Sequence, residues 1–193
     1  MGEYRGILLV GPPGCGKGTQ GKLLNQKDGY FHFSTGDMFR DLDNSTELGS
    51  KVKTLIDSGN FVDDATTIAL AKETLQEYER NNVFDPNDYL VLDGLPRNIA
   101  QVSLVSEFVL ESHILYFEVP RNKLIERIKS RAIKEGRADD ANEERILKRL
   151  NTFDEITKPM LLEYPIFNIV NINANKPVED VQNDILGILG KKN

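Results

Sequence analysis

The chain of 193 residues is 39% hydrophobic and 28% charged, which is enough apolar material for one globular domain with a real core. With 24 basic and 30 acidic residues its formal charge is −6, so it lacks the positive field expected of a nucleic-acid-binding protein. A single cysteine, Cys15, excludes an internal disulfide and a multi-cysteine structural zinc site. No apolar stretch of about 18 residues and no signal-peptide pattern occur, which predicts a cytoplasmic protein that does not cross a membrane.

Apolar stretches of strand length alternate with longer helix-like stretches along the chain. Strands are expected at 6–10, 30–33, 89–92, 114–119 and 165–170. Helices are expected at 17–27, 36–43, 47–58, 64–81, 98–111, 121–133, 141–163 and 177–190. Nearly continuous apolar strands separated by helices are typical of a parallel sheet covered on both faces. The pattern therefore predicts a single α/β domain over 1–193, with a five-stranded parallel sheet flanked by helices.

Two segments depart from this alternation. Residues 34–63 are long and helical for a connection between two strands, and we expect them to form an inserted cap. Residues 131–141 become polar and lose their apolar periodicity, which predicts a short surface lid. Mobile parts of this kind close over bound substrates and exclude water.

The sequence GPPGCGKGT follows the first expected strand at residues 11–19. Gly11, Gly16 and Lys17 have the spacing of the P-loop, although Gly18 stands where Ser or Thr is usual. Glycines let backbone N–H groups converge on a phosphate, and the helix that begins there turns its positive end towards it. A glycine-rich turn alone would not explain the strand before it and the helix after it. We therefore predict a P-loop NTPase fold with phosphate-binding residues Gly14, Cys15, Gly16, Lys17, Gly18 and Thr19.

Asp93 directly follows the apolar stretch at 89–92. An acid at the carboxyl end of a buried parallel strand would face the phosphate loop and hold Mg²⁺ through water. Cys15 lies inside the loop and is interpreted as a small residue that fits a tight turn rather than as a nucleophile, because no His and Asn arrangement supports one.

Six of the ten arginines lie between residues 121 and 149. This segment has ten basic and six acidic residues, a net charge of +4 in an acidic chain. Solvated helix faces with (i, i+4) ion pairs explain Arg121 and Arg145. A group of guanidinium groups around phosphates explains the others, because arginine is planar, always charged and bidentate. The arginines assigned to this group are Arg127, Arg131, Arg137 and Arg149.

Four segments, taken in order, resemble those of the adenylate kinase family of nucleoside monophosphate kinases. GPPGCGKGTQ at 11–20 resembles its phosphate loop, and STGDMFR at 34–40 resembles its monophosphate-binding segment. DGLPR at 93–97 with Gln101 resembles its signature segment, and GRADD at 136–140 with Arg149 resembles its lid and lid hinge. The matches span almost the whole chain. The resemblance implies reversible, Mg²⁺-dependent phosphoryl transfer from ATP to AMP, giving two ADP, by a short-lid monomer.

On the donor side the resemblance implies that the phosphate loop binds ATP. Arg131 would lie over the donor nucleotide, Arg127 would face its phosphates, and the backbone of Lys176 would meet the donor adenine. Asp37 and Asp93 would hold metal-bound water. The catalytic residues implied are Lys17, Arg97, Arg127, Arg131, Arg137 and Arg149.

On the acceptor side Thr35 and Arg40 would hold the sugar and phosphate of AMP, and Arg97 would contact its α-phosphate. Gln101 would hydrogen-bond the acceptor base, because its amide offers both a donor and an acceptor to adenine. Arg137 and Arg149 would clamp the transferred group and the acceptor phosphate. The remaining AMP-binding residues implied are Asn60, Phe61, Val62, Gly94, Leu95 and Pro96.

The sequence departs from the family pattern at two places. Leu95 stands where the family usually has an aromatic residue, which we expect to change packing only. One extra residue lies between Asp140 and Arg149, in the segment that follows the lid. The lid is short, and with one cysteine it cannot be the zinc-carrying long lid of some relatives.

Two alternatives are considered for the function. UMP/CMP kinases share the plan and nearly the length, but they typically place an Asp-Asn pair in the segment where this chain has Ile99-Ala100-Gln101, so AMP is favoured as acceptor. A nucleotide-dependent switch is the second alternative, because Asn175-Lys176 begins like a guanine-reading motif. Val178 and Glu179 follow and the required Asp is absent, which favours the kinase.

Overall fold

The computed structural model describes residues 4–58, 60, 62–135 and 142–190. One sheet contains the strands β1 (Tyr4–Val10), β2 (Tyr30–Ser34), β3 (Tyr89–Asp93), β4 (Val109–Glu118) and β5 (Ile169–Asn173). Their order is β2-β3-β1-β4-β5, and every neighbouring pair is parallel. The prediction of a five-stranded parallel sheet is confirmed. The chain moves from β1 first to one side and later to the other, and ligands bind beyond the carboxyl ends of strands at such a switch point.

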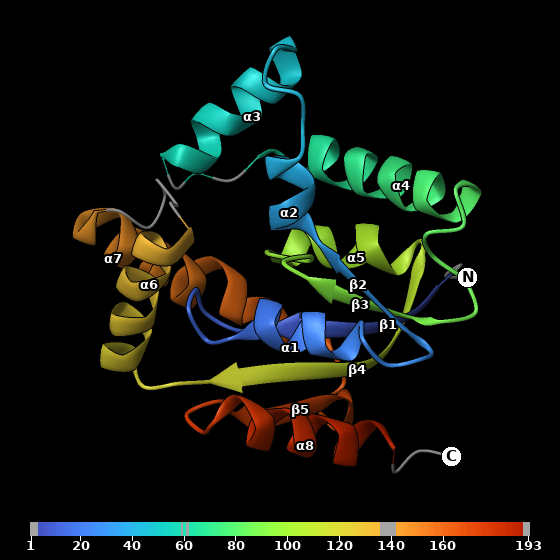
Figure 1. Cartoon of the computed structure of the whole chain (residues 1–193), viewed down its shortest axis with the longest axis vertical. Helices are drawn as coiled ribbons and strands as arrows, with labels where there is room; N and C mark the ends of the chain where they lie inside the picture. Colours follow the sequence, from blue (N-terminus) through green and yellow to red (C-terminus); the bar gives the residue numbers. More distant parts are fainter. Residues whose placement is uncertain (1–3, 59, 61, 136–141, 191–193) are drawn as a thin grey trace.

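The helices connect these strands and cover both faces of the sheet. They are α1 (Lys17–Leu24), α2 (Thr35–Arg40), α3 (Glu47–Asp57), α4 (Asp64–Arg80), α5 (Ile99–Ser106), α6 (Arg121–Glu135), α7 (Glu143–Thr152) and α8 (Val178–Leu189). In Figure 1 the carboxyl end of β4 points to the side of the molecule where α6 and α7 lie. Because all five strands are parallel, their carboxyl ends share this side.

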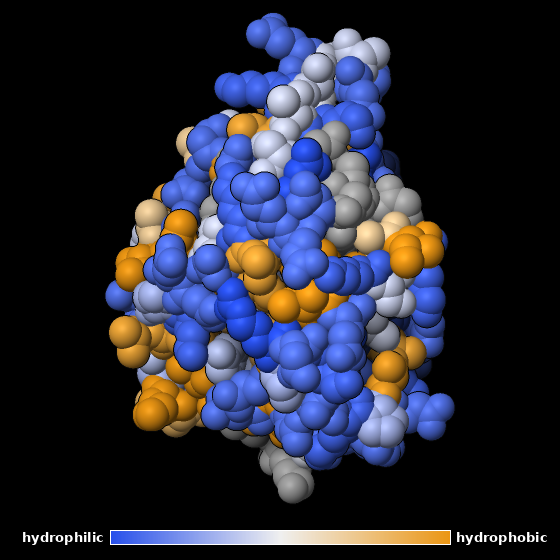
Figure 2. Space-filling view, turned by 90° about the vertical axis from the view of Figure 1, so that its left-hand side faces the viewer, coloured by the Kyte–Doolittle hydropathy of each residue, from blue (hydrophilic) through white to orange (hydrophobic). Residues whose placement is uncertain are grey.

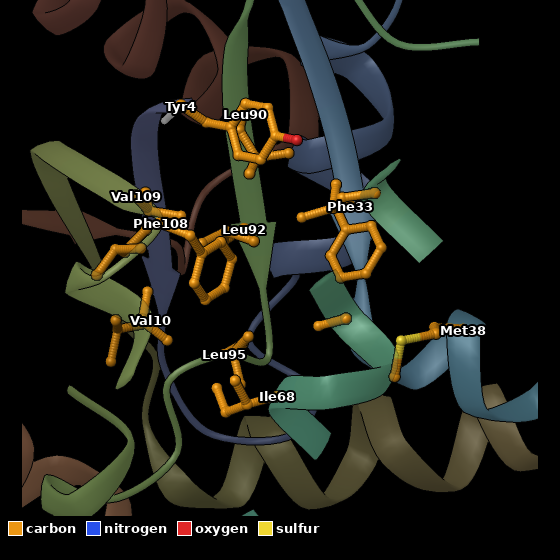
Figure 3. Packing of buried hydrophobic residues seen from close by; sticks show 14 of the residues in the cluster. Tyr4, Val10, Phe33, Met38, Ile68, Leu90, Leu92, Leu95, Phe108 and Val109 are labelled. Carbon is orange, nitrogen blue, oxygen red and sulfur yellow. The ribbon is translucent and has the colours of Figure 1, made fainter. Parts of the chain in front are cut away.

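Two hydrophobic clusters lie on the two faces of the sheet, because alternate residues of a strand point in opposite directions. Leu8 and Val10 belong to the first cluster, which includes side chains of α4 and α5. Ile7 and Leu9 belong to the second, with side chains of α1, α6, α7 and α8. Figure 3 shows the first cluster from close by, with Leu92 of β3 among its neighbours. The packing fixes the strands whose ends carry the phosphate loop.

Replacing Leu92 by alanine tests this core. Leu92 is 0% exposed, so the substitution removes apolar contacts and leaves a cavity. The free energy of unfolding is expected to fall by about 3 kcal/mol in urea denaturation. Val83 is 57% exposed, and its replacement by alanine should change the same quantity by less than about 0.5 kcal/mol. Equal losses in both variants would contradict the burial of Leu92.

The helix expected at 98–111 ends at Ser106, and β4 begins at Val109, earlier than the predicted strand at 114–119. The register of β4 against β1 shifts between Gly6 and Ile7, so β4 has an irregularity there. This part of β4 therefore lacks the continuous apolar pattern on which the strand prediction relied. Ser112 lies at this irregularity, and its hydroxyl donates to the carbonyl of Gly6 at 3.0 Å. A polar residue at a bulge interrupts the apolar run that otherwise marks a buried strand.

The predictions at 165–170 and 141–163 also differ from the structure. A short 3₁₀ turn occupies 166–168, with Ile166 86% and Phe167 77% exposed, and β5 follows at 169–173. The single long helix predicted at 141–163 is instead α7 followed by a π-helical turn at 153–157 and a 3₁₀ segment at 158–163. Pro159 lies in that last segment and supplies no backbone N–H for a regular helix.

The predicted cap at 34–63 contains α2 and α3, and Figure 1 shows α3 standing away from the sheet. The boundaries of the cap stay a prediction. In the predicted lid at 131–141, residues 131–135 continue α6, whereas 136–141 lie outside the described residues. Within the described part of the chain, the helices are too short or too polar to span a bilayer.

Candidate functional site

The predicted phosphate loop connects β1 to α1. Gly14 and Gly16 have φ angles of 80° and 101°, a backbone region that favours glycine. At Gly14 a Cβ would also lie 2.8 Å from Cγ1 of Ile128 and 3.0 Å from the carbonyl oxygen of Leu124. Gly16, the N-cap residue of α1, has no side chain to cap the first turn, where the N–H groups lack intrahelical partners. This geometry provides an anion site at the helix N-terminus.

Lys17 begins α1 and turns its side chain back over the loop. Its Nζ donates to the carbonyl oxygens of Gly11 at 2.6 Å and Pro12 at 3.3 Å. Cys15 is 1% exposed, and its Sγ lies 3.5 Å from the same Nζ. The ammonium group is therefore held at the loop, where a bound phosphate would compete with two carbonyl groups for it.

The loop lines a cleft of about 870 Å³ beyond the strand ends. Guanidinium-bearing side chains from four other segments line the same cleft. They are Arg40 of α2, Arg97 after β3, Arg127 and Arg131 of α6, and Arg149 of α7. Figure 2 looks onto the side bearing α6 and α7 and shows a mostly hydrophilic face with a small apolar area at its centre. Arginines that are distant in sequence are thus brought together with Lys17.

Asp93 ends β3 and lies between the phosphate loop and β2. Its Oδ2 is 3.7 Å from Nε2 of His32, and a Cβ at Gly18 would lie 3.3 Å from that oxygen. Burial by itself raises the pKa of the Asp93 carboxyl. The His32 imidazole and the charges of Lys17 and Arg97 outweigh burial, so this pKa lies below its usual value. The side chain is therefore a carboxylate at neutral pH.

Asp37 of α2 also lines the cleft and forms an ion pair with Arg40. Ser34 caps α2, because its hydroxyl accepts from the N–H of Asp37 at 3.2 Å. Groups of three or more His, Cys, Asp or Glu side chains able to hold a metal are absent from the described residues. The cleft contains Asp37 and Asp93, the two carboxylates that the sequence analysis assigns to metal-bound water.

The turn after β3 fixes Arg97. Gly94 has a φ of 87°, and a Cβ there would lie 2.6 Å from Oγ1 of Thr35, so only glycine fits. The buried Thr35 hydroxyl donates to the carbonyl oxygen of Gly94 at 3.0 Å. Arg97 donates from Nε to the same carbonyl oxygen at 2.7 Å and from Nη2 to Oγ1 of Thr35 at 3.4 Å. Thr35 is thus a support of the turn and is not among the residues that line the cleft within the described part of the chain.

Asn60 and Lys176 both line the cleft. Lys148 of α7 donates from Nζ to Oδ1 of Asn60 at 2.7 Å, which joins the end of the predicted cap to the helix that carries Arg149. The Lys176 ammonium pairs with Asp184 of α8 at 2.7 Å, so its side chain is directed along that helix.

Several predicted residues lie elsewhere. Val62 and Leu95 are 7% and 2% exposed and belong to the first core cluster rather than to the cleft lining. Gln101 is 3% exposed, and both ends of its amide contact protein groups. Gly94 and Pro96, by contrast, do line the cleft. Phe61 and Arg137, which the resemblance assigns to the site, lie outside the described residues.

The cleft also has apolar lining that the sequence did not reveal. Phe39, Ile56, Phe153, Val178 and Val181 contribute to it. Phe153 follows Arg149 by four positions, and helical spacing was the available signal that the two share a face. The valines of α8 carry no such signal, because their placement depends on how α8 packs against α1.

The site combines a strand, a glycine loop and a helix that begins at a lysine, and a set of arginines lies opposite them at the carboxyl edge of the parallel sheet. These features define a P-loop protein that binds nucleotide phosphates. The sequence profile of the adenylate kinase family matches residues 9–168. The chain therefore belongs to the adenylate kinase family.

Three relatives named adenylate kinase illustrate the similarity. The protein of Leptospira biflexa is 37% identical over 187 residues, covering 93% of this chain and 97% of its own. The protein of Bifidobacterium longum is 36% identical over 190 residues, covering 95% and 98%. The protein of Borrelia garinii is 31% identical over 216 aligned positions, covering 97% and 100%. Each alignment thus covers more than nine-tenths of this chain.

Proposed function

We propose that this protein catalyses reversible phosphoryl transfer from ATP to AMP, giving two ADP. The observation that carries the proposal is the single cleft in which the phosphate loop and Lys17 meet arginines from α2, α6, α7 and the turn after β3. Such a cleft suits two anionic nucleotides placed end to end. Membership of the adenylate kinase family and the names of the relatives favour AMP over the pyrimidine acceptors of the UMP/CMP alternative.

On the donor side, the backbone of Gly14–Thr19 and the Lys17 ammonium bind the ATP phosphates. Arg127 donates from Nη1 to the carbonyl oxygen of Ala174 at 3.1 Å, next to the segment that contains Lys176. This contact supports a division of roles opposite to the sequence expectation. We assign Arg127 to the adenine side, together with the backbone of Lys176, and Arg131 to the phosphates.

On the acceptor side, Arg97 binds the α-phosphate of AMP, with Arg40 and Arg149 adding positive charge around it. Gln101 hydrogen-bonds the base of AMP through the second N–H of Nε2 and the second lone pair of Oε1, which its two contacts with protein groups do not use. The other residues proposed for AMP are Thr35, Asn60, Phe61, Val62, Gly94, Leu95, Pro96 and Arg137. Val62, Leu95 and Thr35 are buried, so their proposed role is to support the residues that contact AMP.

The chemistry asks little covalent work of the protein. An α-phosphate oxygen of AMP attacks the γ-phosphorus of ATP, while the bond from that phosphorus to the β,γ-bridging oxygen breaks. The acceptor phosphate is already anionic, so no general base is needed. Lys17 and the arginines bring the two phosphates together and stabilise the charge that moves onto their oxygens.

Asp37 and Asp93 fit the Mg²⁺ that accompanies ATP. Both are in the cleft, and Asp93 is a carboxylate beside the phosphate loop with a lowered pKa. Magnesium prefers oxygen ligands and keeps several waters when it is bound through substrate phosphates, so two carboxylates acting through water suffice. Bound there, Mg²⁺ would neutralise charge on the β- and γ-phosphates. The side chains of Asp37 and Asp93 would orient its water shell.

We propose further that the protein acts as a cytoplasmic monomer on small-molecule nucleotides and not on nucleic acid or at a membrane. The net charge of −6 supports the statement about nucleic acid, because duplex-binding proteins need a positive field. The proposals of a monomer and of the compartment rest on the family resemblance.

Assays with three acceptors test the proposed function. With Mg-ATP as donor, kcat/KM for AMP is expected to exceed the values for CMP and UMP by about 100-fold, because a buried amide that pairs with one base edge rejects others. ADP formation is followed in a coupled assay. A preference for either pyrimidine nucleotide would establish the alternative, and a complete lack of ADP from ATP plus AMP would overturn the kinase assignment.

A further inference from the structure

One carboxylate oxygen joins two amide groups beside the acceptor segment. Asp64, the first residue of α4, is half-buried. Its Oδ1 accepts from Nε2 of Gln101 at 2.6 Å and from Nδ2 of Asn98 at 2.9 Å. Two amide donors on one carboxylate oxygen form charge-assisted hydrogen bonds, which are stronger than neutral ones.

Gln101 extends the connection to Arg97. Its Oε1 accepts from the backbone N–H of Arg97 at 2.8 Å, while its Nε2 faces Asp64. The amide thus has one orientation that satisfies both neighbours. Turned over, it would place an oxygen against the carboxylate and N–H groups against a backbone N–H. Because Gln101 is 3% exposed, water does not replace the lost partners.

Asn98 gives Asp64 a second hold on the same turn. Its Oδ1 caps α5 by accepting from the backbone N–H of Gln101 at 2.8 Å. Asp64 therefore binds Asn98, which follows Arg97, and Gln101, which accepts the backbone N–H of Arg97. Arg97 itself lines the cleft, whereas Asp64 does not line it within the described part of the chain.

We propose that Asp64 is a positioning residue for the acceptor nucleotide, which acts through Gln101 and Asn98 on Arg97. The proposal rests on the proposed function, in which Arg97 binds the α-phosphate of AMP. Asp64 touches no nucleotide. It connects the start of α4, where the predicted cap ends, to the backbone of Arg97, whose side chain holds the acceptor.

Four variants test the proposal by steady-state kinetics. Asp64→Ala leaves two amide donors without their acceptor and is expected to raise KM for AMP about tenfold, with KM for ATP changed by less than about twofold. Asp64→Asn keeps an oxygen acceptor and should restore KM for AMP to near the wild-type value. Asp64→Glu keeps the charge but displaces the oxygen, and should behave like Asp64→Ala.

Asp63→Ala is the matched control. Asp63 caps the same helix, because its Oδ1 accepts from the N–H of Thr66 at 2.9 Å, but it is not part of the path to Arg97. This variant should lower the thermal stability and leave KM for AMP unchanged. If Asp63→Ala raises KM for AMP as much as Asp64→Ala, or if Asp64→Ala leaves it unchanged, Asp64 has no positioning role.

Hydrogen exchange at the backbone amide of Arg97, measured by NMR on the wild-type chain and the same variants, is independent of turnover. Exchange at this amide should accelerate about tenfold or more in Asp64→Ala and Asp64→Glu, but not in Asp64→Asn or Asp63→Ala. Unchanged exchange in Asp64→Ala and Asp64→Glu would overturn the path. A wild-type protein that makes no ADP from ATP and AMP would instead refute the proposed function, while the exchange rates still decide whether Asp64 holds Arg97.

Discussion

Replacing Lys17 by methionine is expected to lower kcat by about three orders of magnitude while the protein stays folded. Methionine has nearly the length of lysine but no charge, so the γ-phosphate loses the ammonium that Gly11 and Pro12 hold at the loop. The glycine turn and α1 do not depend on that charge. The substitution therefore separates charge stabilisation from the shape of the loop.

The measurement is ADP formation from saturating ATP and AMP, with thermal unfolding as a check of the fold. Lys27→Met is the control, since Lys27 is exposed and is not among the residues lining the cleft. It should keep wild-type kcat. Turnover of Lys17→Met within about tenfold of the wild type would show that this lysine does not stabilise the transferred group.

Replacing Arg97 by lysine is expected to lower kcat/KM for AMP by about two to three orders of magnitude. The guanidinium donates from Nε to the carbonyl oxygen of Gly94 at 2.7 Å, and in the proposed function the same planar group binds the α-phosphate of AMP. A lysine ammonium cannot make both sets of contacts from one planar group. Charge is conserved in this substitution, so any loss reports geometry.

Arg80→Lys provides the comparison, because Arg80 is exposed at the end of α4. It should leave kcat/KM unchanged. The donor side offers an internal check, because KM for ATP should change far less than KM for AMP in Arg97→Lys. Near-native kcat/KM for AMP in that variant would mean that Arg97 does not bind the acceptor phosphate.

The phosphate loop could be predicted because its determinants are local. A strand, two glycines with positive φ and a lysine at a helix start all lie within residues 4–24. The parallel sheet followed from apolar runs, although β4 and β5 were misplaced where Ser112 makes a bulge and where Ile166 and Phe167 imitate a strand. Exposed apolar residues mislead a periodicity argument, since burial and hydrophobicity are not the same property.

The cleft contains Arg127, Arg131 and Arg149 of the predicted arginine group, but their individual contacts could not be predicted from the sequence. Arg127 and Arg131 are four residues apart, so helical spacing places them on one face without saying which one reaches Ala174. Asp64 carried no signal at all, because its contacts with Asn98 and Gln101 depend on how α4 packs against α5. Such polar contacts between elements distant in sequence are visible only once the elements are packed.

The wall of the cleft near Lys17 is also formed by α8. Gln20 of α1 donates from Nε2 to the carbonyl oxygen of Val178 at 3.0 Å, a contact between residues 158 positions apart. A chain emerging from the ribosome completes the phosphate loop early, but this wall exists only after the final helix has docked. A nucleotide that binds only when α8 is docked against α1 would favour the docked form by mass action. ATP should therefore protect α8 against proteolysis.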